Sequence, residues 1–385
     1  MEIVQEKTGR AAGGDDARNA TGAAAPAPRL AEVARALRAK PFTPHPLFRS
    51  GHAQTLIAFA WPRRRRLREL RADEARLFEV EREVRVLVHC RWQPDRRACP
   101  TLVLVHGLEG SSESIYMLST ALKAHRAGFN VLRLNMRTCG DTLHLTETLY
   151  NSGMSQDLGA LLRELVERDC LTDVFIAGFS LGGNMSLKLA GEYGARFPSA
   201  LKGVCAVSPS VELAASASAI ERRSNRVYQL RFIRSLKRRM REAARLYPER
   251  YDASSLRLVR TLRDFDERYT APHGGFRDAA DYYARSSSLP LIPRIQVPAL
   301  IIHAEDDPFI PFDSLRHPSV GANPNLILLA PRHGGHVGFV SDGNTAGEDR
   351  FWAENRIIEF CERMKGEPEN RSQESGVRVR SQKPE

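Results

Sequence analysis

The clearest indication of the fold of this chain is the stretch Asp173-Val-Phe-Ile-Ala-Gly-Phe-Ser180-Leu-Gly-Gly183. Its apolar run up to Phe179 predicts a buried β-strand, and a helical pattern follows at once through Ala190. Small residues stand two places before and two places after Ser180, which lets the backbones pass at a sharp strand-to-helix turn. Such a turn holds a serine exposed and aims backbone N–H groups at a developing anion. The stretch therefore predicts a strand–turn–helix unit with Ser180 as a nucleophile.

Further apolar runs, separated by helical patterns, occur in the chain before and after this strand–turn–helix unit. Continuous apolar runs are typical of parallel strands that are covered on both faces, and helical patterns separate them here. The sequence therefore predicts an α/β fold, with a mostly parallel central sheet and helices on both faces. The further strands are expected at 101–106, 130–135, 299–303 and 325–329, with an antiparallel pair over 77–92.

Composition divides the chain into three parts. Residues 1–30, rich in Ala, Gly, Asp and Pro, and the polar residues 365–385 are predicted to be disordered, because they have no apolar period. Residues 31–364 are predicted to form one domain. About residues 210–290 interrupt the strand–helix rhythm, and we interpret them as a helical cap over the carboxyl ends of the strands, where such sheets bind ligands. Its basic amphipathic segment carries an apolar stripe at helical spacing: Val227, Leu230, Ile233, Leu236 and Met240.

Charge and composition limit the classes of partner. The 385 residues carry a formal charge of +11, with basic clusters at 63–66 and 222–245. We interpret these clusters first as solvated surface and second as a surface that attracts anionic membranes. No zinc-finger spacing or aromatic-interleaved basic motif accompanies them, so no nucleic-acid partner is expected.

Cysteine usage and hydropathy indicate the compartment. The six cysteines are scattered without a CxxC pair, which favours reduced thiols over a disulfide framework or a metal site. No run of eighteen apolar residues and no secretory leader pattern is visible. The sequence therefore predicts a cytoplasmic protein, with peripheral membrane contact as the variant, and neither a metal nor a cofactor.

A serine nucleophile needs a histidine as general base. His336 lies in the glycine loop Gly334-Gly-His336-Val-Gly338, just after the last predicted strand, where a fold with this serine turn places its base. His333, three residues earlier, is the main rival. We predict that His336 is the general base, because of its position after the last strand more than because it is a histidine.

The histidine in turn needs a carboxylate that orients it. Three acids follow the strand at 299–303, in Ala304-Glu305-Asp306-Asp307-Pro308, and any of them satisfies the chain order serine, acid, histidine. Asp307 stands four residues before Pro311, the spacing usual for this acid, and we predict it. Asp306 is the rival, and would otherwise cap the turn or face solvent.

The loop His106-Gly107-Leu108-Glu109-Gly110 follows the strand at 101–106. Its glycines allow close approach to a substrate oxygen, so we predict an oxyanion hole made by the backbone N–H groups of Leu108 and Leu181. The alternative is an ordinary strand-to-helix turn. His106 itself is expected to be structural and to hold the loop by hydrogen bonds.

Taken together, residues 44–364 resemble the YheT-like branch of the α/β-hydrolases, which is related to the abhydrolase-domain esterases and lipases of animals. The matching stretches are His106-Gly-Leu-Glu-Gly-Ser-Ser112, Asn135-Met-Arg137 with Cys139-Gly140, Leu149-Tyr150 with Gly153, Gly178-Phe-Ser-Leu-Gly-Gly-Asn184, Asp306-Asp307-Pro308 and Gly334-Gly-His-Val-Gly-Phe339. Phe265-Asp266 with Thr270-Ala-Pro272, and Asp281-Tyr-Tyr283, resemble the cap region of the family. His45-Pro-Leu-Phe and Gly51-His-Ala-Gln-Thr55 resemble its opening segment.

This resemblance implies hydrolysis of carboxylic esters, such as short- or medium-chain acyl esters, acylglycerols or other lipid esters, without a metal or cofactor. Animal relatives carry an N-terminal membrane anchor, and this sequence shows no apolar run of that kind. Two alternatives stay open at this point. The same three residues could pass the acyl group to an alcohol or thiol, or the fold could serve as a non-catalytic binding protein.

Overall fold

A computed structural model describes residues 27–61, 63 and 74–366 of the chain. An eight-stranded sheet in the order β1-β2-β4-β3-β5-β6-β7-β8 forms its centre. The pairs β1–β2 and β2–β4 are antiparallel and all other pairs are parallel, which confirms the predicted fold class. The strands are β1 (Glu74–Glu81), β2 (Val84–Arg91), β3 (Thr101–Val105), β4 (Asn130–Leu134), β5 (Val174–Phe179), β6 (Leu201–Val207), β7 (Ala299–Ile302) and β8 (Leu326–Leu329).

Two hydrophobic layers cover the sheet, because the strands bury side chains on both faces. In β3, Val103 and Val105 join one buried cluster, while Leu102 and Leu104 join the other. The first cluster packs against α5 (Ser155–Glu167), α6 (Leu181–Tyr193) and α12 (Pro318–Ala322). The second packs against α1 (Pro28–Arg38), α4 (Ile115–Arg126) and α13 (Trp352–Met364). Continuous apolar strands therefore follow from burial on both sides.

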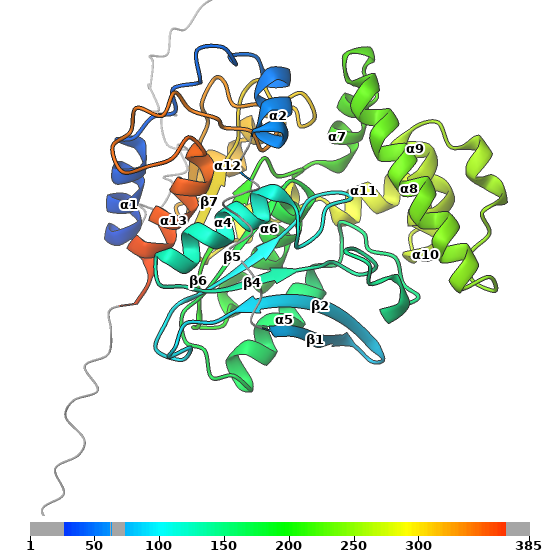
Figure 1. Cartoon of the computed structure of the whole chain (residues 1–385), viewed down its shortest axis with the longest axis horizontal. Coiled ribbons are helices and arrows are strands. Elements are labelled where there is room, and N and C mark those ends of the chain that lie inside the picture. The colour runs from blue at the N-terminus through cyan, green and yellow to red at the C-terminus, as the bar shows by residue number, and fades with distance from the viewer. Residues whose placement is uncertain (1–26, 62, 64–73, 367–385) are drawn as a thin grey trace, which may run out of the picture.

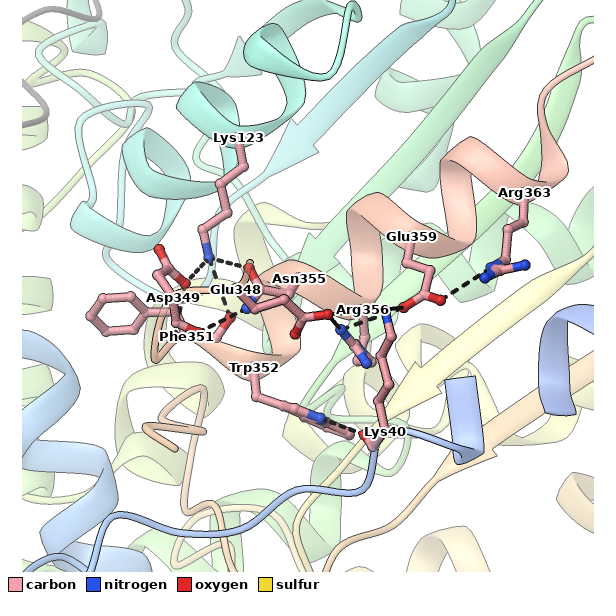
Figure 2. Close-up of polar contacts among 10 residues, drawn as sticks. All are labelled: Lys40, Lys123, Glu348, Asp349, Phe351, Trp352, Asn355, Arg356, Glu359 and Arg363. Atoms are coloured by element: carbon pink, nitrogen blue, oxygen red, sulfur yellow. Dashed lines mark hydrogen bonds and ion pairs between the residues drawn. The ribbon is translucent and has the colours of Figure 1, made fainter. Parts of the chain in front are cut away.

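Polar contacts fasten the helices α1, α4 and α13 together at the edge of the second layer (Figure 2). Lys40, just after α1, binds Glu359 of α13 at 3.0 Å, and its carbonyl accepts the indole N–H of Trp352 at 2.8 Å. Lys123 of α4 binds Asp349 at 2.6 Å, immediately before α13. The segment that precedes the sheet is thus held against the last helix of the fold.

Between β6 and β7 the chain leaves the sheet for about ninety residues, and we call this excursion, residues 208–298, the cap segment. Its helices lie together on one side of the molecule, in green and yellow (Figure 1). They are α7 (Leu213–Ile220), α8 (Arg226–Leu246), α9 (Leu262–Phe265), α10 (Ala271–His273) and α11 (Ala279–Ser286). A buried cluster of their side chains also includes Phe309 and Ile310, which follow β7. The cap segment therefore rests on the loop that leaves the carboxyl end of β7.

The apolar stripe predicted on α8 does not behave as one surface. Ile233, Leu236 and Met240 are buried in the cap segment, but Val227 is 76% exposed and Leu230 is 42% exposed. The buried cluster of cap side chains includes Ile233, Leu236 and Met240, whereas Val227 and Leu230 do not belong to it. The stripe is therefore buried at its last three residues and exposed at its first two.

The predicted disordered ends lie largely outside the described residues. Helix α1 begins at Pro28, so the last residues of the predicted arm 1–30 are helical instead. From the basic cluster at 63–66 only Arg63 is described, and it is buried in an ion pair with Glu354 at 2.7 Å. Of the helices in the described parts of the chain, none is long and apolar enough to cross a membrane.

Candidate active site

Ser180 stands at the turn between β5 and α6, with φ of 54° and ψ of −116°. This region of backbone space is costly for a residue with a side chain, and packing forces it here. A Cβ on Gly178 would lie 2.2 Å from the carbonyl oxygen of Gly182, and a Cβ on Gly182 would lie 2.4 Å from that of His106. The two glycines are thus required by close backbone approach, as the sequence predicts.

The structure brings Ser180, His336 and Asp307 into one hydrogen-bonded chain. The Nε2 atom of His336 lies 2.9 Å from Ser180 Oγ, and its Nδ1 atom lies 2.8 Å from Asp307 Oδ2. A carboxylate accepts only, so Nδ1 carries the proton and Nε2 is free to accept the serine proton. The arrangement has the geometry of a nucleophile, a base and an orienting acid.

Asp307 is held as an anion inside the protein. Its side chain has no exposed surface, and its second oxygen accepts the N–H groups of Phe309 and Ile310 at 2.8 and 3.0 Å. Burial alone raises the pKa of a carboxyl group. The contact with His336 and these N–H donors outweigh it, so the pKa of Asp307 falls below its usual value.

The rival candidates form a separate pair. Asp306 accepts the N–H of Gly335 at 2.9 Å and lies 3.3 Å from His333 Nδ1, and neither residue contacts Ser180. The His333 side chain is 46% exposed. Asp306 thus shapes the glycine loop instead of facing the ring of His336.

A second support of the histidine loop comes from α2 (Gly51–Ala60), for which the sequence predicts no role. The hydroxyl of Thr55 accepts the backbone N–H of His336 at 2.8 Å and donates to the carbonyl of Gly51 at 2.7 Å. Gln54 accepts the N–H of Val340 at 2.7 Å. The stretch Gly51-His-Ala-Gln-Thr55 resembles the opening segment of the family in the sequence. That resemblance does not indicate which residues the segment contacts.

The loop at 106–110 is rigidly held, and His106 is structural as expected. Its ring donates from Nδ1 to the carbonyl of Gly107 at 2.8 Å and accepts at Nε2 from the N–H of Met136 at 3.1 Å. Burial lowers the pKa of His106 to about 4, so the ring is neutral. Among the described residues, the backbone N–H groups of Leu108 and Leu181 have no hydrogen-bond acceptor. Two free donors therefore stand beside Ser180, one in the loop after β3 and one at the first residue of α6.

The residue after Leu108 ties this loop to the cap segment. Glu109 accepts the Nε–H of Arg239 at 3.0 Å and the hydroxyl of Tyr150 at 3.0 Å, and it also accepts the hydroxyl of Ser235. Its side chain is 6% exposed and that of Arg239 is 15% exposed. The position of α8 is therefore coupled to the loop through a mostly buried ion pair.

A cavity of about 110 Å³ opens beside Ser180, between the sheet and the cap segment. Leu108 and Leu181 line its floor, and Leu236 of α8 lines its cap side. Most of the remaining lining side chains are aliphatic or aromatic. In the described parts of the chain, no group of three or more His, Cys, Asp or Glu side chains is arranged to hold a metal ion. The site brings a serine hydroxyl, a histidine ring and free N–H donors next to a space for an apolar group.

Comparison with known proteins supports this chemistry. Residues 100–342 match the family model described as the alpha/beta hydrolase fold. The chain is 34% identical over 263 residues to the Escherichia coli protein named "Putative esterase YheT", which covers 68% of this chain and 76% of that protein. It is 31% identical over 255 residues to a monoacylglycerol lipase of Saccharomyces cerevisiae, covering 64% of this chain but only 56% of the lipase.

A solved structure, the esterase Pf2001 of Pyrococcus furiosus, superposes with a TM-score of 0.50 over 76% of this chain and 93% of its own. The sequence identity is 16%, so this likeness concerns the fold alone.

Proposed function

The chain belongs to the α/β-hydrolase fold family, in the branch of the YheT-like esterases, and from this premise we propose that it cleaves carboxylic esters with Ser180 as nucleophile. The observation that carries the proposal is the hydrogen-bonded chain from Asp307 through His336 to Ser180, at the floor of an apolar cavity. Yeast and bacterial relatives named as a lipase and an esterase support it.

In this mechanism Ser180 Oγ attacks the ester carbonyl while His336 Nε2 takes its proton. The carbonyl oxygen becomes an anion, and the N–H groups of Leu108 and Leu181 stabilise it, each contributing about 3 kcal/mol. His336 then gives the proton to the leaving alcohol, and the acyl group stays on Ser180. Asp307 keeps the ring in the required tautomer and stabilises its charged form.

Water then releases the acyl group from Ser180, with His336 acting again first as base and then as acid. His336 takes a proton from water, the resulting hydroxide attacks the acyl group, and the proton returns to Ser180 Oγ as the acid leaves. An alcohol in place of water gives acyl transfer with the same residues. The choice between them depends on which acceptor reaches the acyl group below the cap segment.

The proposal is tested with a fluorophosphonate probe and a panel of esters that varies acyl length. We expect the probe to label the wild type and not Ser180→Ala, and the panel to give free acids. A protein that only binds ligands would stay unlabelled. Formation of a new ester when ethanol is added, in place of free acid, would assign the transfer reaction instead.

We also propose that the protein contacts anionic membranes through a surface formed by α2 and the start of α8. Leu56 and Phe59 of α2 are 57% and 43% exposed, beside the exposed Val227 and Leu230 of α8. The guanidinium of Arg231 lies 5.7 Å from the ring of Phe59, which places the two helices side by side. Exposed arginines interleave with these apolar groups, namely Arg226, Arg231, Arg234 and Arg238. An apolar surface bordered by cations suits an anionic bilayer.

A further inference from the structure

One carboxyl group stands in the otherwise mostly apolar wall of the cavity beside Ser180. Asp266 lines this cavity from the cap segment, together with the aromatic residues Phe265 and Tyr269. The catalytic steps proposed above do not use it. A polar group in an apolar binding site usually fixes the orientation of a ligand or selects it.

The local backbone around Asp266 is unusual. Residues Asp266–Thr270 form one π-helical turn directly after α9. Such turns are rare and occur often at functional sites, because they bring a side chain to a position that a regular helix does not offer. Here the turn places the carboxyl group at the cavity.

Two hydroxyl groups hold the carboxylate in place. Thr270 donates to Oδ1 at 2.6 Å, and Tyr283 of α11 donates to Oδ2 at 2.7 Å. Asp266, Thr270 and Tyr283 come from the stretches of the cap that resemble the YheT-like family, so the fold gathers these stretches at one point of the cavity. Two donors still leave about half of the acceptor sites of a carboxylate open.

Within the described ranges of the chain, no Lys, Arg or His side chain forms an ion pair with Asp266. Burial raises its pKa to about 6, with the two hydroxyl donors and the charge of Arg263 acting against this shift and Glu221 adding to it. A partly buried acid with open acceptor sites gains free energy from any further donor that enters the cavity.

We propose that Asp266 accepts a hydrogen bond from a hydroxyl group of the substrate, so the preferred ester carries a hydroxyl group away from its scissile carbonyl. A neutral donor fits better than an ammonium group, because Arg239 lines the same cavity and Arg263 lies near the carboxylate. This inference rests on the proposed ester hydrolysis. It names the class of ester, and Asp266 as the residue that selects it.

The experiment compares esters of equal size with and without the hydroxyl group. One pair differs at the end of the alcohol half and a second pair at the end of the acyl half, with CH₂OH in place of CH₂CH₃. We expect kcat/KM of the wild type to favour the hydroxyl ester of one pair by about tenfold to a hundredfold, the range of a hydrogen bond to a charged group. Equal values in both pairs, or a stronger preference for a matched trimethylammonium ester, would overturn the inference.

Variants assign the preference to the residue. Asp266→Leu removes the acceptor and should bring the ratio within each pair close to one, with Asp266→Asn as the variant of equal size should the leucine variant not fold. Asp264→Asn is the matched control, since Asp264 binds the N–H groups of Arg260 and Thr261 at the start of α9 and does not line the cavity. It should keep the wild-type ratio. A ratio that survives in both Asp266 variants would contradict the assignment.

Failure of this inference is distinguishable from failure of the proposed function. If only the selection is wrong, the wild type still hydrolyses the alkyl esters and still reacts with the fluorophosphonate probe. If the hydrolysis itself is wrong, neither the labelling nor the cleavage of any ester in the pairs is seen.

Discussion

Replacing Asp307 by asparagine separates the orienting role of a carboxylate from simple packing. The asparagine side chain is nearly equal in size, but its NH₂ group would face the Nδ1 atom of His336, which now lies 2.8 Å from a carboxylate oxygen. The ring would then take the tautomer with the proton on Nε2, and it could no longer accept the proton of Ser180. Enzymes with the same three residues lose about 10⁴ in kcat by this change.

We expect a loss of about that size in kcat for Asp307→Asn, with KM changed little because the cavity is not emptied. Asp306→Asn is the matched control. Its amide oxygen can still accept the N–H of Gly335, and the side chain at this position is 23% exposed, so the loss should stay below about tenfold.

The assay is steady-state hydrolysis of a chromogenic ester by the two variants, with thermal unfolding as a check of folding. If Asp306→Asn lost more turnover than Asp307→Asn, the acid would be assigned to the wrong residue. If both variants kept more than about a tenth of the wild-type kcat, the carboxylate would have no orienting role.

The remaining predictions concern the cap segment. Arg239→Met should lower the free energy of unfolding in urea by about 3 kcal/mol, because it leaves Glu109 buried without its cationic partner. The double variant with Glu109→Gln should lose less free energy of unfolding than the sum of the two single changes. Strict additivity would contradict the coupling between the two residues. The pKa of Asp266 in the folded state is raised to about 6, so ionisation of this group lowers the stability of the fold as the pH rises. The free energy of unfolding of the wild type, relative to that of Asp266→Asn, should therefore fall by up to about 3 kcal/mol between pH 4 and pH 8. A difference that stays constant with pH would contradict this shift. Sedimentation with anionic vesicles should be clear at 0.1 M salt and lost at 1 M, where the Debye length falls from about 10 Å to about 3 Å. The exposed pair Arg234→Glu and Arg238→Glu should weaken it, and unchanged binding by that double variant would place the contact elsewhere.

The local pattern of the sequence predicts the parts of the site that local geometry makes. Consecutive residues indicate the strand, the turn and the helix around Ser180, because close backbone contact requires glycine at a fixed spacing from the serine. Strand order then indicates His336 and Asp307, since this fold places base and acid after particular strands. The structure brings these three predicted residues within hydrogen-bond distance.

Contacts between distant segments were not predictable in this way. The hydroxyl of Thr55 holds the backbone of His336 across 281 residues of sequence, and Arg239 reaches Glu109 across 130. No period or spacing in the sequence around Thr55 or Arg239 indicates which distant residue each one contacts. The same holds for α8, where helical spacing predicts an apolar stripe but not how far along the helix its neighbours extend.

In the proposed mechanism, Ser180 carries the acyl group during turnover. It is tested most directly by quenching the enzyme with acid during hydrolysis of an ester whose acyl group leaves slowly, and by mapping the peptides by mass spectrometry. We expect the peptide containing Ser180 to gain the mass of the acyl group less one hydrogen, and this gain to disappear as the ester is used up. An acyl group found on another residue, or no covalent species while the ester is being hydrolysed with excess substrate present, would contradict this mechanism.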